Sequence, residues 1–291
     1  MPSTREMRLR IKSVKSLSQV TRALETVSAS KVKRAMAANS ATLPYAEKAW
    51  KVLVHLARQP GHASLHPLLN ERKNVNRILV IMISGDSGLA GSYNVNILKY
   101  TMENFSKRSV PVDFVAVGKK GRDMLIRRRF NVVADFPELG NPATFIETSA
   151  ASRLAVDDYL HGKYDQVYIT YTRFISMSKQ ETVMRKLLPL EMEEKDRKTV
   201  SNNQAVFTYE PEQKDLLDEI IPRFTAMQVY QAILSSQASE HAARMMAMAN
   251  ATDNANALIS ALQLDYNKAR QQIITNEMLD IVGGAAALES R

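Results

Sequence analysis

The sequence predicts a mixed fold (α+β and α/β): a long antiparallel coiled coil built from the N- and C-terminal helices, plus a central Rossmann-like α/β domain. Residues 4–43 lack glycine and proline, and so does the stretch between Pro222 and Val282. Between these segments, short apolar runs alternate with helical ones, which is typical of a largely parallel sheet covered by helices. We expect the coiled coil to comprise residues 1–59 and 208–291, the α/β domain residues 75–192, and the connectors residues 60–74 and 193–207.

The C-terminal segment predicts one very long helix. Sixty helical residues, at about 1.5 Å per residue, would extend on the order of 90 Å, far more than an ordinary globular helix. A stripe of mostly apolar residues recurs along it at alternating steps of four and three, the spacing of a left-handed coiled coil. Its members are His241, Met245, Met248, Thr252, Ala255, Ile259, Leu262, Tyr266, Ala269 and Ile273.

The N-terminal segment predicts a second long helix. Apolar residues recur along it at steps of three and four, which places them on one face. They are Ile11, Val14, Leu17, Val20, Leu24 and Val27. Pro44 is expected to kink this helix before it resumes over residues 45–58. Antiparallel pairing would bury both apolar stripes, and the longer C-terminal helix would extend past its partner.

The central region predicts alternating strands and helices. The expected strands are Arg77–Ser84, Val112–Val117, Val132–Asp135, Gln166–Tyr171 and Glu181–Leu190, and the expected helices are Asn94–Lys107, Lys119–Arg129 and Pro142–Gly162. The turn at residues 174–179 predicts a hairpin between the last two strands. The charged residues from Glu191 onward predict an exposed link to the final helix.

Charge narrows the possible partners. The net charge is +9, and residues 1–40 carry nine basic residues against two acidic ones. A basic helix suits either a nucleic acid or an acidic protein surface, or it is simply a solvated face. The chain has no cysteine, which excludes disulfides and thiolate metal sites. It shows no signal peptide and no membrane-spanning run, so a cytoplasmic location is the default expectation.

Three short patterns are candidates for chemistry, and none is convincing. Residues 85–91 (GDSGLAG) follow a strand and precede a helix, as phosphate loops do, but their spacing matches neither a P-loop nor a dinucleotide fingerprint. Residues 85–88 echo a serine-protease nucleophile without a matching triad. His62 and His66 are four apart but lie among prolines and a glycine that disfavour a helix. We therefore predict no catalytic residue, no metal site and no cofactor, and a binding, structural or mechanical role gains weight.

The two ends of the chain closely resemble the γ subunit of F-type ATP synthases. At the N-terminus the resemblance rests on residues 11–15 (IKSVK) and 20–31 (VTRALETVSASK). At the C-terminus it rests on residues 239–245 (SEHAARM), 251–255 (ATDNA), 266–271 (YNKARQ), 274–277 (ITNE) and 281–285 (IVGGA). The glycine-rich turn also matches, with Ala90 where a cysteine is frequent and Ser92 where a second glycine is common. The resemblance covers essentially the whole chain.

The resemblance implies a non-catalytic rotor shaft that couples ion-driven rotation of a membrane c-ring to conformational cycling of the catalytic β subunits. The implied partners are the α and β subunits, ε and the c-ring, with no nucleic acid. The implied contacts to the β catch loops are Arg244, Gln271 and Thr275. The basic helix facing the acidic β loops would use Arg8, Lys12, Lys15, Arg22, Lys31 and Lys33, and the foot near ε and the c-ring would include Tyr209 and Glu210. The implied location is peripheral, on the cytoplasmic face of a bacterial plasma membrane, or on the matrix face of the inner membrane in an organelle.

Two other functions remain open at this stage. One is a nucleotide-binding enzyme built on the central α/β domain, and the other is a basic coiled-coil protein that binds nucleic acid. A rotor also carries its own expectation: its upper end should be slim, without large apolar anchors, and residues 283–288 (GGAAAL) would suit a small bearing surface.

Overall fold

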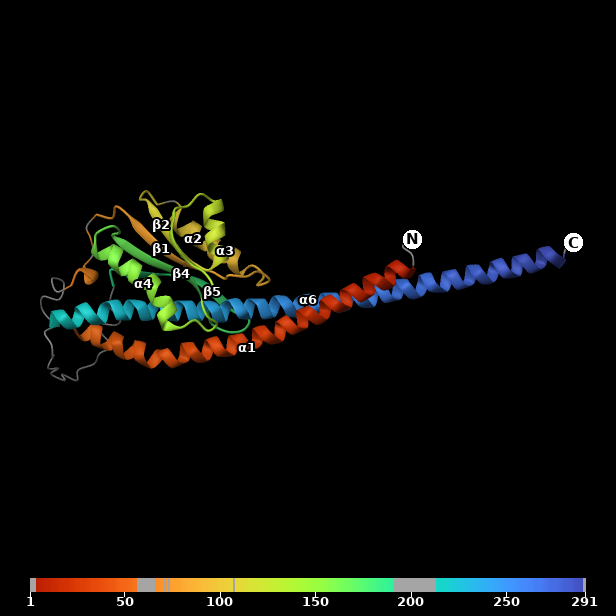
Figure 1. Cartoon of the computed structure of the whole chain (residues 1–291), viewed down its shortest axis with the longest axis horizontal. Coiled ribbons are helices and arrows are strands. Elements are labelled where there is room, and N and C mark those ends of the chain that lie inside the picture. The colour runs from red at the N-terminus through yellow and green to blue at the C-terminus, as the bar shows by residue number, and fades with distance from the viewer. Residues whose placement is uncertain are drawn as a thin grey trace. The chain divides into compact units, whose positions relative to one another are not determined.

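The computed structural model describes residues 4–56, 66–70, 72, 74–106, 108–190 and 213–289. In chain order the elements are α1 (Thr4–Leu56), η2 (Pro67–Leu69), β1 (Ile78–Ile83), α2 (Tyr93–Phe105), β2 (Val112–Val117), α3 (Lys119–Arg127), β3 (Val132–Phe136), α4 (Phe145–Leu160), β4 (Gln166–Phe174), β5 (Gln180–Leu188) and α6 (Gln213–Glu289) (Figure 1). The predicted order of strands and helices is confirmed.

The chain divides into two compact units, which we describe separately. One unit comprises Met1–Val27 with Met245–Arg291, and the other comprises Ser28–Arg244. The divisions that the sequence predicts, at residues 59, 75, 192 and 208, stay a prediction, since residues 57–65 and 191–212 lie outside the described part of the chain. Within the predicted connector 60–74, η2 carries Leu68, whose side chain is fully buried in the core.

The larger unit contains a five-stranded sheet in the order β3-β2-β1-β4-β5. The pairs β3–β2, β2–β1 and β1–β4 are parallel, and β4–β5 is the predicted antiparallel hairpin. Strand β1 is buried along its whole length because the sheet is covered on both faces, as parallel sheets usually are. Such a sheet, built from strand–helix–strand units, is doubly wound.

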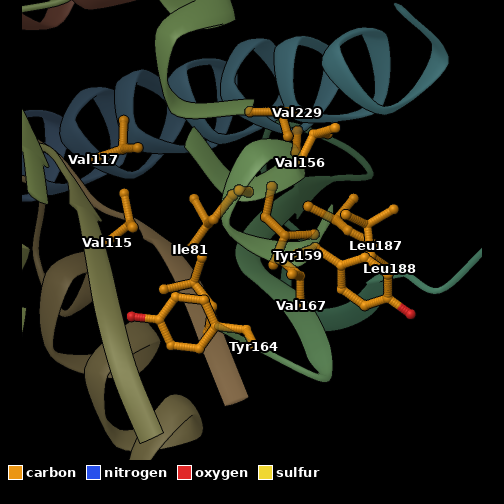
Figure 2. Close-up of a cluster of buried hydrophobic side chains, with 14 of the residues drawn as sticks. Ile81, Val115, Val117, Val156, Tyr159, Tyr164, Val167, Leu187, Leu188 and Val229 are labelled. Atoms are coloured by element: carbon orange, nitrogen blue, oxygen red, sulfur yellow. The ribbon is translucent and has the colours of Figure 1, made fainter. Parts of the chain in front are cut away.

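Alternation along β1 separates two cores. Ile78, Val80 and Met82 face a cluster that includes residues of α2 and α3. Leu79, Ile81 and Ile83 face the other cluster, in which α4 contributes Val156 and Tyr159 and α6 contributes Val229 and Ile233. Figure 2 shows Ile81 and Val167 from the sheet beneath Val156 of α4 and Val229 of α6. The long C-terminal helix is therefore part of the core of the α/β fold.

Neither proline interrupts its helix. Pro44 lies inside α1 and Pro222 lies inside α6, and both helices continue through them. The predicted kink at Pro44 therefore does not divide α1 into two helices. The predicted start of the final helix at Pro222 was late, and its predicted end at Val282 was early. The packing of α6 side chains on both sides of Pro222 compensates for the lost backbone hydrogen bond, since Ile221 and Phe224 are both buried.

In the smaller unit, α1 and α6 pair in opposite directions, as predicted. The hydroxyl of Ser18 donates to Asn256 Oδ1 (2.9 Å), the hydroxyls of Thr21 and Thr252 are 2.7 Å apart, and Arg8 donates to the Tyr266 hydroxyl (2.7 Å). Partner numbers fall on α6 as they rise on α1, which defines an antiparallel pair.

The seam on α1 differs from the predicted apolar stripe. Leu17, Val20 and Val27 are more than half exposed, at 56%, 56% and 51%, whereas Ser18 and Thr21 are buried. The prediction was therefore wrong at these three apolar positions. Small hydroxyl side chains let the two backbones approach closely, and each finds a hydrogen-bond partner across the seam, which offsets the cost of burying it. Sequence reasoning had assumed that the apolar residues must face the partner helix.

The stripe predicted on α6 is confirmed up to Ala269. Met248, Thr252, Ala255 and Ala269 are buried. It fails at Ile273, which is 44% exposed. Thr4, the first described residue, precedes Arg8 by about one helical turn, so α1 begins about one turn beyond Tyr266 in this antiparallel pair. The end of α6 therefore has no part of α1 opposite it.

The expectation of a small bearing surface at residues 283–288 stays a prediction, but the preceding turns of α6 carry large exposed apolar side chains. Six apolar side chains along this end are between 44% and 72% exposed. They are Ile273, Ile274, Met278, Leu279, Ile281 and Val282. At about 100° per residue they are distributed around most of the helix circumference. Across the part of the chain that is described, no helix is both long and apolar enough to cross a membrane.

Gly283 lies inside α6 with no atom within 4 Å of the position that a Cβ would occupy. Glycine in a helix interior destabilises the helix by roughly 0.5–1 kcal/mol relative to alanine, because it loses more backbone entropy on folding. We expect Gly283→Ala to slow amide hydrogen exchange around residues 279–287 by roughly two- to fivefold. Unchanged exchange at these amides would show that this turn is not helical in solution.

Candidate functional site

The binding crevice of the doubly wound sheet is occupied by α6. In such sheets ligands bind outside the carboxyl ends of the strands, at the point where the strand order reverses, which here is between β1 and β4. The carboxyl end of β4 meets a serine-rich turn of α6. Ser235 Oγ accepts the N–H of Phe174 (3.0 Å), and Ser239 Oγ donates to the carbonyl of Thr172 (3.0 Å).

Ser236, on the same turn, reaches toward helix α2. The Tyr93 hydroxyl lies 2.7 Å from Ser236 Oγ and donates to the Ser236 carbonyl oxygen (3.1 Å). Tyr93 and Ser236 are both buried. Burial, aided by the charge of Glu240, raises the pKa of Tyr93 well above its usual range, so the hydroxyl remains protonated and can donate.

Little space remains at this end of the sheet. A cavity of about 30 Å³ lies between the sheet and α6, lined by Ser84, Asp86, Tyr93, Ser236 and Glu240 among others. A water molecule needs about 10–15 Å³ of such volume, so the cavity holds one or two waters. It cannot admit a nucleotide, because the space that a nucleotide would use contains the α6 side chains.

The turn at residues 85–91 is held by its own polar groups. Asp86 Oδ1 accepts the N–H groups of Lys119 (2.9 Å) and Glu138 (3.2 Å), and the N–H of Gly85 donates to Asn94 Oδ1 (2.9 Å). Positive φ occurs at Gly91 (φ 57°), and a second positive φ falls on Leu89 (61°). Gly85 serves close approach instead: a Cβ there would lie 2.7 Å from the carboxyl carbon of Glu240.

Arg244 joins α6 to this turn. Its guanidinium donates through Nε to the carbonyl of Gly88 (3.2 Å) and through Nη2 to Ser87 Oγ (3.1 Å), and it forms an ion pair with Glu240 one helical turn away. Arg244 and Glu240 are both buried, with 9% and 8% of their surface exposed. Burial raises the pKa of Glu240, and the neighbouring Arg244 opposes that shift.

His241 completes the cluster. Arg244 Nη1 lies 3.0 Å from His241 Nδ1, and the side-chain amide of Asn141 contacts Nε2. A guanidinium can only donate, so Nδ1 accepts and the ring proton of the neutral imidazole lies on Nε2, which requires the Asn141 amide to turn its oxygen toward this nitrogen. Burial and the charge of Arg244 lower the pKa of His241 to about 4, so the ring is neutral near pH 7.

This lowered pKa predicts how stability depends on pH. An unfolded histidine, with a pKa near 6.5, binds a proton more readily than the folded one, so stability falls as pH decreases from about 6.5 to about 4. The full loss is roughly 3 kcal/mol. The raised pKa of Glu240 acts in the opposite direction above its unfolded value, because the folded state then binds the proton more readily.

We therefore expect His241→Asn to flatten the dependence of unfolding free energy on pH between pH 4 and 6.5. Glu240 is retained in both proteins, so their difference isolates His241. Urea titrations followed by the fluorescence of the single tryptophan, at several pH values, measure the effect. Parallel curves for the two proteins would contradict this assignment.

The residues predicted to meet β subunits are distributed over both units. Gln271 and Thr275 are exposed and one turn apart on α6 in the smaller unit. Arg244 belongs to the larger unit, where its guanidinium group already donates hydrogen bonds within the chain. Tyr209 and Glu210 lie outside the described residues.

Most of the basic residues of α1 that are predicted to face the β subunits are exposed. Lys12, Lys15, Arg22 and Lys33 are exposed, and Lys31 is half-buried. Arg8 is exposed and also contacts the ring of Tyr266, with its guanidinium carbon 5.6 Å from the ring centre. The Arg8 guanidinium therefore already takes part in the contact between α1 and α6.

The other sequence candidates have structural roles. His66 is buried, accepts the N–H of Leu68 at Nδ1 (3.1 Å) and pairs through Nε2 with Asp218 (3.0 Å). His62 lies outside the described residues. Among the residues that the structure describes, no group of three potential metal ligands gathers. Ser87 of the protease-like motif bonds to Arg244 and not to a histidine.

Sequence reasoning missed Tyr93, Ser235, Ser236, Gln237 and Ser239. The available signal was the polar run at residues 235–241 (SSQASEH), which interrupts an otherwise apolar part of the helix. In a helix paired with only one partner, such a run would be solvated. Its burial requires hydrogen-bond partners from elsewhere in the chain.

Comparisons with known proteins agree with this architecture. A family model described as ATP synthase matches residues 3–288. Among the similar proteins, the ATP synthase gamma chain of Dehalococcoides mccartyi (strain CBDB1) is 44% identical over 99% of this chain and 100% of the relative. That of Roseiflexus sp. (strain RS-1) is 41% identical over 99% of each chain.

Solved structures agree as well. One, titled as the central stalk and c-ring of the Tetrahymena thermophila mitochondrial ATP synthase, has a TM-score of 0.60 at 26% identity and covers 80% of this chain and 99% of its own. Another, from the Euglena gracilis mitochondrial ATP synthase, has a TM-score of 0.67 at 18% identity, covers 99% of this chain and 95% of its own, and supports the fold alone. The full-length matches in sequence mean that this chain belongs to the ATP synthase family and, within it, to the gamma chains.

Proposed function

We propose that this chain is the central rotor shaft of an ATP synthase, coupling ion-driven rotation of a membrane c-ring to the conformational cycle of the catalytic β subunits. As a gamma chain it is a non-catalytic subunit. The observation that carries the proposal is the antiparallel pairing of α1 with α6, in which, among the described residues, the end of α6 has no part of α1 opposite it. The proposed partners are an α3β3 hexamer, ε and the c-ring.

The apolar end of α6 supports a bearing role within a ring of subunits. Its exposed residues include Ile274, Leu279 and Val282, which point in different directions around the helix. Apolar contact is non-directional, so a surface of this kind can pack against an apolar sleeve at every angle of rotation.

Angle-dependent contacts require directional groups, and Gln271 and Thr275 are proposed to supply them to the β catch loops. Arg244 is proposed to contribute less than a free guanidinium would. An arginine has five N–H donors, and four of them are directed at Gly88, His241, Ser87 and Glu240. One donor remains for a β subunit, so its contact there is a single hydrogen bond.

The basic residues of α1 are proposed to face acidic loops of the β subunits. Helical spacing places Lys12, Lys15 and Arg22 on one face, and all three are exposed. Protein carboxylates and nucleic-acid phosphates both suit such a face. The ATP synthase relatives, matched over their full length, favour the protein surface. Tyr209 and Glu210 are proposed as part of the foot near ε and the c-ring.

Attachment at the membrane is proposed to be peripheral, through the c-ring. The face would be the cytoplasmic side of a bacterial plasma membrane, or the matrix side of the inner membrane in an organelle. A nucleotide-binding enzyme is disfavoured, because α6 fills the crevice where a doubly wound sheet binds its ligand. No cofactor is proposed.

Co-expression with the α and β subunits of the same source tests the proposal. We expect the chain to co-purify with α and β, and ATP-driven proton uptake by membrane vesicles to require it. The charge reversal Lys12→Glu/Lys15→Glu should reduce ATP-driven uptake, whereas Lys179→Glu, on the exposed hairpin turn, should not. A chain that does not associate with α and β, but binds ATP alone or is retained on DNA in a salt-sensitive manner, would contradict the proposal.

A further inference from the structure

We propose that residues 235–244 of α6 form a torque-bearing joint that prevents the shaft helix from turning about its own axis within the α/β domain. This inference rests on the proposed rotor function and deepens it. A rotor transmits torque only if its foot and its shaft turn together. The joint lies entirely within the unit Ser28–Arg244 and is built from directional hydrogen bonds on several sides of one helix.

Three sets of hydrogen bonds hold α6, and we call each set a grip. The first grip comes from the sheet and α2. Ser235 and Ser239 bond to backbone groups at the carboxyl end of β4, and Ser236 bonds to Tyr93. The N–H of Thr172 also points at Ser236 Oγ, at 3.5 Å. Backbone groups of a central sheet are rigid anchors, because each strand is held by its neighbours.

The second grip comes from the loop that precedes α4. Gln237 bonds to it twice: its Oε1 accepts the N–H of Ala143 (3.0 Å), and its Nε2 donates to the carbonyl of Gly140 (2.8 Å). His241, one turn further along, contacts the side chain of Asn141. The third grip is Arg244, which donates to the turn at residues 85–91.

These grips surround the helix. Each residue is rotated by about 100° from the one before it, so Ser235, Ser239 and Ser236 span about 100° of the circumference. Arg244, Gln237 and His241 extend the gripped arc to about 240°. Most side chains of the joint are also shielded from water, since Ser236, Ser239 and His241 are 3% exposed or less.

Apolar packing holds the same helix face from one side. Contacts such as those of Val229 keep the buried face of α6 against the sheet, and the hydrogen bonds add directional restraint on the other sides. Hydrogen bonds weaken steeply as their angle departs from linearity. Bonds on opposite sides of the helix therefore resist turning in both senses.

The test removes grips from two directions while preserving side-chain volume. The variant Tyr93→Phe/Gln237→Leu deletes the Tyr93 hydroxyl and both bonds of Gln237. The matched control is Tyr168→Phe/Gln180→Leu, which makes the same two changes at side chains that bond to Gln166 and to the 176–177 turn, not to α6. Each chain is assembled with its α, β, ε and c partners and reconstituted in lipid vesicles.

ATP hydrolysis and proton uptake are then measured together against increasing opposing proton gradients. Without a gradient we expect the same proton uptake per ATP in all complexes. At the largest gradient that the unaltered complex sustains, uptake per ATP should fall at least about threefold in the joint variant, because each neutral hydrogen bond removed favours a disengaged joint by roughly two- to tenfold. The control should match the unaltered complex.

Equal proton uptake per ATP in the joint variant and the control at every gradient would overturn the inference. A second variant covers a failure of the first to assemble. Because the chain has no native cysteine, Thr172→Cys/Ser236→Cys introduces a single thiol pair across the joint. Because this variant also removes the Ser236 hydroxyl from the joint, the reduced complex should lose proton uptake per ATP at large gradients, and oxidation, which locks the joint covalently, should restore it. Arrest on oxidation would show that the joint moves, which would also overturn the inference.

These outcomes are separable from failure of the proposed function. If the unaltered chain were not a rotor, the unaltered complex would show no dependence of proton uptake on this chain. If only the joint were wrongly assigned, the unaltered complex would couple normally and the joint variant would behave as the control does.

Discussion

Replacing Arg244 with alanine is expected to destabilise the unit Ser28–Arg244 by roughly 3–5 kcal/mol. The substitution leaves Glu240 buried without its partner and removes the donors to Gly88 and Ser87. Trp50, the only tryptophan, stacks on Phe224 at 5.4 Å in the same unit, so its fluorescence in a urea titration reports this unfolding.

A double-mutant cycle provides the control. Glu240→Gln/Arg244→Ala removes both charges, so it should cost less than Arg244→Ala alone, because no unpaired charge remains. A loss below 1 kcal/mol for Arg244→Ala, or additive effects in the cycle, would contradict the buried ion pair. The seam contacts of the coiled coil do not involve Arg244, so far-ultraviolet circular dichroism should retain most of its helical signal.

Arg244→Ala should also weaken coupling between rotation and ATP turnover in the assembled enzyme. The physical reason is the loss of the third grip on α6, together with the single hydrogen bond proposed toward β. Proton uptake per ATP is the relevant measurement. If hydrolysis and proton pumping both remain unchanged, Arg244 acts in folding alone.

Gly118→Ala is expected to be the most damaging single-methyl change, destabilising the α/β unit by about 3 kcal/mol or more. A Cβ at this position would lie 2.3 Å from the carbonyl oxygen of Ser84, and the backbone φ of 96° already disfavours any residue with a side chain. The obstruction is backbone at the carboxyl end of β1, which cannot move without disturbing its pairing with β2. Thermal unfolding followed by tryptophan fluorescence measures the loss.

Gly88→Ala is the matched control for this prediction. No atom lies within 4 Å of the position that its Cβ would occupy, and its φ is not positive. The expected change in stability is within about 0.5 kcal/mol. Similar losses for the two variants would mean that the close approach of Gly118 to Ser84 does not exist in solution.

The paired helices and the alternating central elements were predictable because their signals are local. Long segments without glycine or proline predict helices, and short apolar runs between turn signals predict strands. The strand Val112–Val117 was predicted to the residue. Helix ends were less accurate, since α6 begins at Gln213, ahead of Pro222, which tertiary packing tolerates inside the helix.

The buried face of α1 in the coiled coil could not be predicted from local sequence. Composition favoured Leu17 and Val20 as buried, yet Ser18 and Thr21 face α6. Which stripe of a helix is buried depends on the partner surface, and here Asn256 and Thr252 offer hydrogen bonds that apolar side chains cannot form. No pattern within α1 alone contains that information.

By itself, the sequence determined two long terminal helices, the order of the strands and helices between them, and a family resemblance that full-length relatives bear out. Tertiary structure alone decided how α6 is used. It places Ser236, Gln237 and Arg244 against three different parts of the α/β fold, where the sequence indicated only a polar run and one exposed arginine contact. The reason is physical: helix propensity and periodicity act over a few neighbouring residues, whereas a buried polar group is satisfied by atoms that lie more than ninety positions away along the chain.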